Sequence, residues 1–512
     1  LGVTAGVAGN RILIDDVSIA GTGTAATAAN NSTHNGVGVT SNVNSDLAIV
    51  NSQGNIGVTT FAQTVGARVL AGVQSSKSSQ LALADNSITA AATGNTASSA
   101  IASGQNAASF TGTAAVSNQQ ANSAAGVTAF VMPSIIAAQT GESPGNGQTT
   151  GSTVTVSDNT TAATAQGNQV TQSLALQAAT VALGNGNAVL SGGTANDGRV
   201  STSGAATLTN LQGNYNDGGA AALNLGSQIH LTANGGGAPV ANNTLALSGN
   251  RQEAVALGSG ASNTLTLTGN SVGTGAGIAS VQMNDASSGV GAGLSDPEAR
   301  IGVDGNLSGG SAAVAGNLQR AIAYGNSATN TLGVSAGNLA AAPGPILLGA
   351  AASTVTVDLA SGLPFSNAAG ALPTVRAAYG VLNDQSVQAT VNSAATGPNT
   401  FAATVNGNVS AASVSNSGNA FVGAAYGNDA ASGVTLGLNN VSGSNASIAN
   451  VTNTQAVAVT NTKISAIAAG GIVARTTVAG ALTNGSVSST GNTAEALAYG
   501  SRATANTVKV TG

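Results

Sequence analysis

The chain has 512 residues, of which 6% are charged and 2% aromatic, with 71 glycines, no cysteine and no tryptophan. A hydrophobic share of 42%, much of it alanine and valine, is too high for a typical disordered chain and favours many thin layers over one bulky core. The net charge of −5, with 12 scattered lysines and arginines, argues against a nucleic-acid-binding face, and the lack of cysteine excludes disulfides, thiolate metal sites and a cysteine nucleophile.

The N-terminal part of the chain, positions 1–85, differs from the rest. It holds more charge, including Asp15, Asp16 and Lys77, and few copies of the repeat that follows. That repeat predicts a solenoid, and the open strands at a solenoid end need a cap. We therefore predict an irregular N-terminal cap or docking region at residues 1–85 and a β-solenoid at residues 86–512.

The repeat is clearest between Asn243 and Asn270, which reads NTLALSGN, RQEAVALGSGAS and NTLTLTGN. Leucines alternate with small polar residues in both outer segments, a pattern typical of a strand with one buried face. The first of these segments starts at Asn243 and the second at Asn263. A strand that returns at fixed spacing predicts a solenoid, so we expect coils of about 20–22 residues and a rod on the order of 110 Å long.

A longer unit recurs along the chain. Each copy has an asparagine, small residues four and six positions later, a glycine, and a pair of leucines or valines separated by one residue, although the copy at residue 159 lacks the usual preceding glycine. We predict two short strands per copy, with small inward side chains facing larger ones across a narrow interior. The copies begin at Asn159, Asn250, Asn317, Asn419 and Asn492.

Asparagine and glycine mark the predicted corners, because both tolerate the left-handed backbone that a sharp bend requires. The structural corner residues that we select are Asn159, Asn250, Asn270, Asn317, Asn419 and Asn492. Asparagines stacked in register would hydrogen-bond along the axis as a ladder. The alternative is that asparagine only suits turns. We predict corners first, with ladders wherever successive coils align.

Three stretches interrupt the repeat, and we predict insertions near residues 130–150, 284–306 and 339–374. The first contains FVMPSIIAA, the most apolar segment of the chain, and its Pro133 argues against a central strand. We expect this segment to be a flap over one end of the coil or an assembly patch. The second holds a cluster of charge and the third several prolines, so both are expected to contain loops.

Four tyrosines lie between an alanine and a glycine: Tyr324, Tyr379, Tyr426 and Tyr499. Their neighbours are predicted inward alanines, so we expect these rings to point outward beside a corner. A stripe of exposed tyrosines would suit carbohydrate stacking or protein contact. The alternative, which we favour, is that each ring covers the glycine next to it.

No catalytic or cofactor site can be recognised in the sequence. His34 and His230 have no partners at metal-ligand spacing and form no Ser-His-Asp pattern, so we expect both at the surface. Asp296, Glu298 and Asp304 could meet around calcium, but their spacing fits neither an EF-hand nor a calcium repeat, which favours a solvated loop. We predict no enzyme, no cofactor and no metal.

The motif G-N-x-x-x-A-x-A-[YL]-G-[NS]-x-A-x-N-T-[LV] resembles the repetitive passenger regions of bacterial surface β-solenoids. It is most similar to the alanine- and asparagine-rich β-strand-repeat proteins of alphaproteobacteria, including the holdfast-anchor type that attaches an adhesive polysaccharide to the cell. The resemblance covers residues 150–512. It implies export, a location outside the cell or on its surface, and a mechanical role, and it brings no catalytic residues.

The expected fold is an all-β, single-chain β-solenoid with loop insertions, and the final NTVKVTG matches the repeat unit, so we expect an uncapped end there. The favoured function is an exported structural protein that builds or anchors an extracellular fibre by head-to-tail stacking, promoting attachment and biofilm formation. Its expected partner is a further copy of the same chain, in an end-to-end homopolymer. A surface polysaccharide and an outer-membrane anchor are further candidates. We expect no nucleic-acid partner. The alternatives are a monomeric adhesin or glycan-binding rod and, behind it, a β-helix enzyme that degrades polysaccharide.

Overall fold

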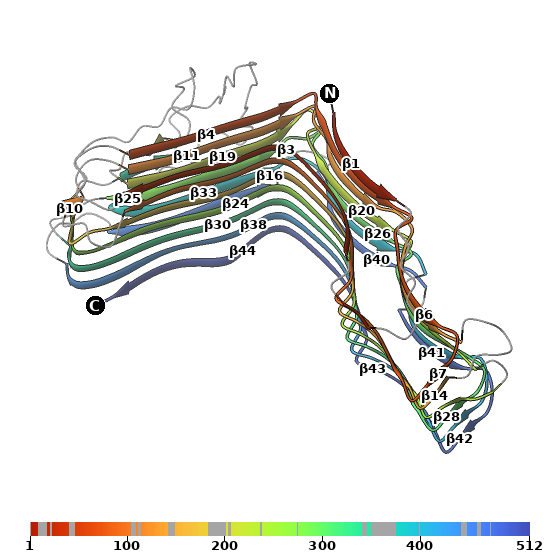
Figure 1. The fold of residues 1–512 in the computed structure, drawn as a ribbon. Coiled ribbons are helices and arrows are strands. Elements are labelled where there is room, and N and C mark those ends of the chain that lie inside the picture. The colour runs from red at the N-terminus through yellow and green to blue at the C-terminus, as the bar shows by residue number, and fades with distance from the viewer. Residues whose placement is uncertain are drawn as a thin grey trace.

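The computed structural model is a single β-solenoid, and its described residues form strands and turns without any helix (Figure 1). The strands of successive coils pair in parallel, so backbone hydrogen bonds run along the axis from coil to coil. The structure describes residues 2–8, 18–20, 23–39, 47–103, 109–110, 114–141, 149–182, 201–202, 206–235, 238–273, 275–339, 346–349, 375–398, 400–441, 448–457, 462–471 and 473–512.

Every complete coil follows the same path. It starts in a cover sheet, passes through four short sheets that we number first to fourth, and closes with a strand of a long sheet that returns beneath the cover sheet (Figure 1). The cover sheet contains β4 (Leu47–Ile56), β11 (Ala114–Ser123), β19 (Ala206–Tyr215), β25 (Ala276–Asn284), β33 (Tyr379–Val387) and β39 (Ala449–Val457). The long sheet contains β3 (Gly23–Val39), β9 (Ser87–Ser103), β16 (Thr160–Gln177), β24 (Arg251–Val272), β30 (Leu318–Leu339), β38 (Ala420–Val441) and β44 (Thr493–Thr511), with β10 (Ser109–Phe110) and β17 (Thr180–Val181) beside it.

The four short sheets keep the same coil order. The first contains β1 (Gly2–Ala8), β5 (Thr59–Val65), β12 (Val127–Val131), β20 (Ala220–Leu225), β26 (Val290–Ser295), β34 (Val391–Thr396) and β40 (Ile464–Ala469). The second contains β6 (Arg68–Val73), β13 (Ser134–Thr140), β21 (Ser227–Asn234), β27 (Glu298–Asp304), β35 (Thr400–Val405) and β41 (Ala474–Val478). The third contains β7 (Ser76–Lys77), β14 (Thr149–Thr150), β22 (Val240–Ala241), β28 (Leu307–Ser308), β36 (Val409–Ser410) and β42 (Leu482–Thr483). The fourth contains β2 (Ser18–Ala20), β8 (Gln80–Ala84), β15 (Thr153–Ser157), β23 (Thr244–Ser248), β29 (Ser311–Ala315), β37 (Ser413–Ser417) and β43 (Ser486–Thr490).

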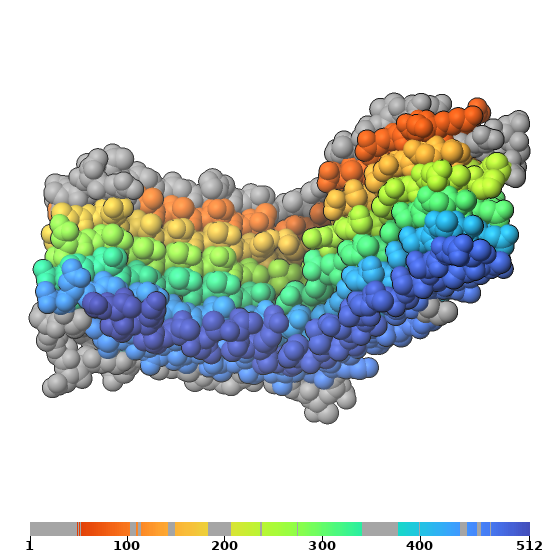
Figure 2. All heavy atoms as spheres, turned by 90° about the horizontal axis from the view of Figure 1, so that it is seen from below, coloured from red at the N-terminus to blue at the C-terminus, as the bar shows by residue number. Residues whose placement is uncertain are grey.

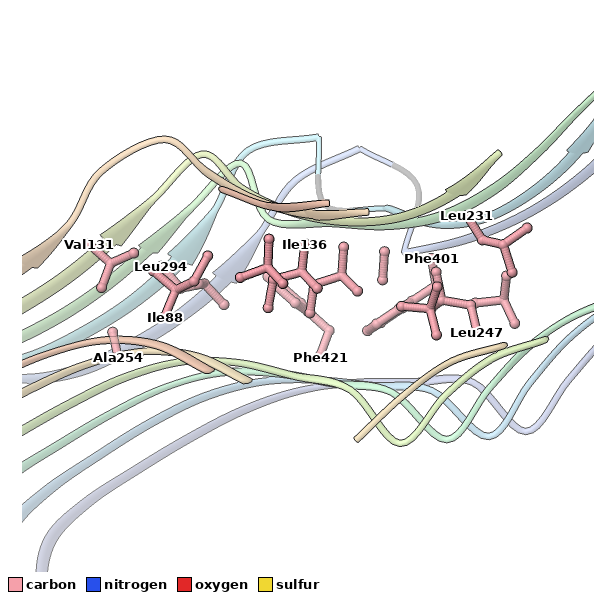
Figure 3. Close-up of a cluster of buried hydrophobic side chains, with 14 of the residues drawn as sticks. Ile88, Val131, Ile136, Leu231, Leu247, Ala254, Leu294, Phe401 and Phe421 are labelled. Atoms are coloured by element: carbon pink, nitrogen blue, oxygen red, sulfur yellow. The ribbon is translucent and has the colours of Figure 1, made fainter. Parts of the chain in front are cut away.

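The long strands bend near their middle, so the cross-section has two arms that meet at an elbow (Figure 1). In arm 1 the cover sheet packs on the C-terminal halves of the long strands, around an apolar core that includes Leu174, Leu265 and Ile278. In arm 2 the four short sheets pack with the N-terminal halves around a second core. Figure 3 shows this core, where Ile136 of the second sheet, Phe421 of the long sheet and other side chains from facing sheets point into the same interior.

The predicted β-solenoid is confirmed, but the predicted coil length is wrong because it is much too short. Stacked side chains one coil apart are separated by 67 positions at Asn55 and Asn122, and by 70 positions at Asn214 and Asn284. The two similar segments that begin at Asn243 and Asn263 lie in one coil, at β23 and in β24. The alternation of leucines predicts the strands correctly, but the spacing between the two segments is a distance between two strands of one coil, not between two coils.

The predicted rod is also wrong in shape. The first sheet holds seven strands, so at about 4.8 Å per coil the stack is roughly 30 Å tall. A long strand such as β24 has 22 residues and a contour of about 70 Å at 3.3 Å per residue. Each longer unit predicted as two short strands is therefore one long strand, and the molecule is a broad, bent slab.

The described part of residues 1–85 belongs to the solenoid. Strands β1 and β3 pair in parallel with β5 and β9, and β4 pairs with β11 over its full length. These residues therefore form coils where an irregular cap was predicted. Asp15 and Asp16 lie outside the described residues.

The predicted insertions have different outcomes. Residues 284–306 run through β26 and β27, which pair with β20 and β21 of the preceding coil. The number of sequence positions between paired residues is the same here as between β19 and β25, so this segment contains no insertion. Most of residues 339–374 lies outside the described residues. Residues that stack in neighbouring coils are 67 positions apart in β24 and β30, but 103 positions apart in β25 and β33. The chain therefore has additional residues between β30 and β33. Strands β18 (Ser201–Thr202), β31 (Ile346–Gly349) and β32 (Val375–Ala377) form a separate antiparallel sheet.

The apolar segment around Pro133 is part of the regular coil. Val131 in β12 and Ile136 in β13 are fully buried in the core of arm 2, while Pro133 lies exposed in the turn between these strands. Proline at a corner removes no hydrogen bond from the sheets, so both the apolar run and its proline fit this position. Neither a flap nor an assembly patch is formed by Val131 and Ile136. Residues 142–148 lie outside the described part of the chain.

Candidate functional site: amide ladders and the open edge of the last coil

A ladder of asparagines runs along the axis where the fourth sheet meets the long sheet. In each pair of neighbouring coils, the backbone N–H and Nδ2 of one asparagine both donate to Oδ1 of the next, at 2.8–3.1 Å. The residue before each asparagine has a left-handed backbone, as at Asp158 (φ 56°) and Gly249 (φ 66°). The members of the ladder are Asn86, Asn159, Asn250, Asn317, Asn419 and Asn492.

Five of the six asparagines selected from the sequence lie in this ladder. Asn270 does not: it is exposed at the outer end of arm 1. Sequence reasoning missed Asn86, which follows Asp85 as Asn159 follows Asp158. Both aspartates have a left-handed backbone, so an Asp-Asn pair marks the same corner as Gly-Asn.

A second set of ladders fills the elbow between the cover sheet and the long sheet. In each neighbouring pair, one glutamine donates from Nε2 to Oε1 of the other at 2.7–2.8 Å. Each Nε2 also donates to a backbone carbonyl of the facing long strand at 2.9–3.0 Å. The members are Gln53, Gln120, Gln212, Gln282, Gln385 and Gln455. Each amide thus bonds in two directions, along the axis and across the interior.

Asparagine columns flank the glutamine column. Asn122 accepts from Asn55 in the preceding coil and donates to Asn214 in the next, and it also bonds Asn95 and Asn168 in the facing long sheet. Sequence reasoning missed this buried network. Its signal is the motif N-x-Q-x-N, which occurs at 51–55, 118–122 and 210–214, with the spacing of the coils.

Three of the four selected tyrosines form a stack on the outer face of the long sheet at the elbow. The rings of Tyr324 and Tyr426 lie 4.7 Å apart and those of Tyr426 and Tyr499 5.4 Å apart, nearly parallel in both pairs. The guanidinium of Arg502 lies 4.1 Å from the Tyr426 ring centre. The middle ring, Tyr426, is covered by the rings of Tyr324 and Tyr499, so the stack favours a structural role over carbohydrate stacking.

Tyr379 was expected to point outward, and that prediction is wrong. Its side chain is fully buried in the apolar core of arm 1, and this burial raises its pKa. Tyr379 begins the cover strand β33 and pairs with Ala276 and Ala449, whereas Tyr324 lies in a long strand. The same three-residue motif therefore occurs in two different strands of the coil.

Two ion pairs join neighbouring coils on the long sheet. Arg320 lies 3.0 Å from Glu253, its register partner in the preceding coil. Arg502 makes a two-point contact with Asp429, at 2.9 and 2.7 Å, again in register. These pairs add directional contacts to the stacking of coils.

The histidine and carboxylate candidates do not gather around one point. His230 Nε2 lies 3.0 Å from Glu298, and this hydrogen bond lowers the pKa of the glutamate. Glu298 also pairs with Arg300, while Asp296 lies at a corner with φ 50°. Over the described residues, no group of three His, Cys, Asp or Glu side chains could hold a metal ion. His34 pairs through its backbone in β3, and its side chain is outside the described part.

In each of the six parallel sheets, the strand of the last described coil has no partner beyond it among the described residues. Val508 and Val510 are 51% and 53% exposed, although their register partners Val434 and Leu436, one coil earlier, are fully buried. Leu482 in β42 repeats this difference against Val409. These exposed side chains continue the buried columns, so the edge presents the interior of the solenoid in cross-section.

The chain matches no known family model, no curated protein and no solved structure. Within the described residues, no helix has the length and apolarity needed to cross a membrane. The site is therefore defined by its geometry alone. Amide ladders stack inside the solenoid, and the last described coil exposes apolar side chains whose register partners in the preceding coil are buried.

Proposed function

We propose that this chain is an exported structural protein whose copies stack end to end into a fibre at the bacterial cell surface, promoting attachment. The observation that carries the proposal is the difference between Val434, fully buried, and its register partner Val508, 51% exposed. Large contiguous patches of exposed apolar side chains are typical of interaction surfaces. Unpaired parallel strands favour covering by another strand of the same direction.

A second copy fits this edge through the sheet topology. The first sheet ends in β1 on one side and β40 on the other, and the path of the long sheet ends in β3 and β44. All neighbours along these paths are parallel, so a copy shifted along the axis would continue both sheets with the same strand direction. A contact of this kind joins unlike ends and propagates without closing.

The slab shape supports stacking as well. A single copy is roughly 30 Å tall across a contour of about 70 Å, so its broad faces are the two edges of the coils. Displayed singly, as in the adhesin alternative, it would add little reach from a cell surface. Stacked copies would gain length by roughly 30 Å each while pairing backbone groups at every junction.

Electron microscopy of the purified chain across a range of concentrations tests the proposal. We expect filaments with an axial repeat of roughly 30 Å and a strong reflection near 4.8 Å in fibre diffraction. The double substitution Val508→Asp and Val510→Asp places two charges on the open edge and should abolish the filaments. The control pair, Thr264→Asp and Thr266→Asp, adds the same charges to the outer face of β24 and should leave them intact.

Two results would contradict end-to-end stacking. Separate particles at every concentration would favour a singly displayed adhesin. Filaments that persist in the Val508→Asp and Val510→Asp variant would show that copies meet through another surface.

A further inference from the structure

A groove of about 850 Å³ lies at the outer end of arm 1, where the long strands finish. Five neighbouring coils line it, each through one position of the same row on the outer face of the long sheet. This row contains Gln177, Thr268, Ser335, Gly437 and Thr511. The groove therefore runs along the solenoid axis, across the strands.

Figure 2 views the molecule from the side of the long sheet, and the coils lie there as successive bands from orange to blue. A ligand lying along the axis would cross one band after another and meet a new set of lining residues in each. This geometry suits a linear polymer, because a compact ligand would contact only two or three coils.

The chemistry of the groove is neutral and rich in hydrogen-bonding groups. Its lining carries amides and hydroxyls, as at Asn270 and Thr268, and none of the lining side chains is charged. Amides and hydroxyls both donate and accept hydrogen bonds, which matches the hydroxyl groups of a sugar. A polymer of acidic sugars would find no positively charged lining residue to pair with its carboxylates.

Close contact between coils shapes the floor. A Cβ on Gly269 would lie 2.5 Å from the carbonyl oxygen of Ala178, so only glycine fits there. At Gly437 the nearest atoms to a Cβ are 3.8 Å away, which leaves the space above that residue open to a ligand. The groove thus forms where glycines without side chains leave space between rows of polar residues.

We infer that this groove binds an extended, neutral glycan chain along the solenoid axis. Coils repeat at about 4.8 Å, so a chain of several sugars laid along the axis would cross all five lining coils. It would meet amide, hydroxyl and backbone groups along the whole groove. The lining comes from within one copy, so binding does not require end-to-end stacking.

Calorimetric titration with cellohexaose and chitohexaose tests this site. We expect saturable binding of at least one of the two, and no binding of an oligogalacturonate of equal length. Gly437→Ile places a branched side chain in the groove and should weaken binding by about tenfold or more. The matched control is Gly333→Ile, at an outer position of the neighbouring strand where a Cβ has free space and which does not line the groove.

Circular dichroism of both variants would show that each keeps its strands. A second variant, Thr268→Ala with Ser335→Ala, removes two hydroxyls without adding bulk and should weaken binding about threefold to tenfold. The inference is overturned if neither neutral oligomer binds, if the acidic oligomer binds more tightly, or if Gly437→Ile and Gly333→Ile bind alike. Repeating the titration with the Val508→Asp and Val510→Asp variant separates this result from filament formation.

Discussion

The elbow and the arms of the solenoid bury different chemistry within the same parallel sheets. Inside arm 1, Leu174, Leu265 and Leu332 stack in an apolar column of the long sheet. A few residues earlier in the same long strands, Asn168 and Asn326 belong to the amide network of the elbow. The elbow and the arms have the same strand direction and the same spacing between coils. They therefore differ only in the side-chain interactions that join one coil to the next.

Apolar columns stabilise the fold through buried area, which has little directional preference. Amide columns are directional, since each Nε2 in the glutamine ladder requires one acceptor above or below and another across the interior. A shift of register by one residue would leave these buried groups without partners. We infer that the arms supply most of the stabilisation and that the elbow sets the register between coils and between the two layers.

The largest effect on the free energy of unfolding is expected at the elbow, from a substitution that adds a charge and removes a hydrogen-bond donor. Gln212→Glu keeps the size of the side chain but removes the donor to Gln120 Oε1 and to the Gly260 carbonyl. We expect it to lower the free energy of unfolding by about 4 kcal/mol at pH 7. Burial would raise the pKa of the new carboxyl above its unfolded value near 4.3, so the loss should grow as the pH rises above about 4.

Urea unfolding followed by circular dichroism measures this loss. The matched variant in the arm is Leu265→Met, a change of similar size without a polar group, which should cost less than about 1.5 kcal/mol. If the two variants were equally stable at pH 7, the proposed distinction between the elbow and the arms would be wrong.

A smaller loss is expected from the asparagine ladder. Asn317→Ala removes the acceptor for the N–H and Nδ2 of Asn250 and the donor to Asn419 and to the Leu247 carbonyl. We expect a loss of about 3 kcal/mol, because several buried polar groups lose their partners together. Asn270→Ala, at the exposed position outside the ladder, should change the free energy of unfolding by less than about 0.5 kcal/mol. Equal losses at the two sites would mean that the ladder contributes nothing beyond a turn.

The smallest effect is a gain in stability at Asp384, beside the elbow ladders. Burial raises the pKa of its carboxyl from 3.8 to about 6, so the folded state binds a proton more tightly than the unfolded state. The wild-type stability should therefore fall as the pH rises from about 4 to 6. Asp384→Asn should remove that dependence and stabilise the fold by about 2 kcal/mol at pH 7.

Thermal unfolding between pH 4 and 7 tests this effect. Glu495→Gln, at an exposed position of β44, provides the control and should leave the pH dependence unchanged. A wild-type stability that rises with pH over this range would contradict the assignment to Asp384.

The sequence predicted the class of fold because its signals are local. Alternation of leucines in 243–270 indicated strands with one buried face, and the Gly-Asn pairs indicated corners. The motif copies at Asn250 and Asn317 are separated by 67 positions, which is the offset between those coils in the structure. The coil length was therefore present in the sequence, but the two similar segments that begin at Asn243 and Asn263 were easier to recognise.

The rest depended on which strands meet across the interior. Tyr379 and Tyr324 share the same local motif, yet one is buried in the cover sheet and the other lies in an outer stack. The glutamine column could be suspected from the N-x-Q-x-N motif, but only the facing long strand explains why amides are buried there. The axial groove joins five coils whose residues are widely separated in the chain.

The sequence by itself determined the strand periodicity, the left-handed corners and the all-β solenoid, because each depends on neighbouring residues and their backbone preferences. The tertiary structure alone decided which similar segments share one coil and which stack on each other, and it alone decided the elbow, the two apolar cores and the facing amide ladders. Successive coils differ in length, with stacked side chains separated by 67 positions between Asn250 and Asn317 and by 103 between Gln282 and Gln385. No single period in the sequence can therefore align the residues that stack, and the alignment comes from the closure of each coil onto the one before.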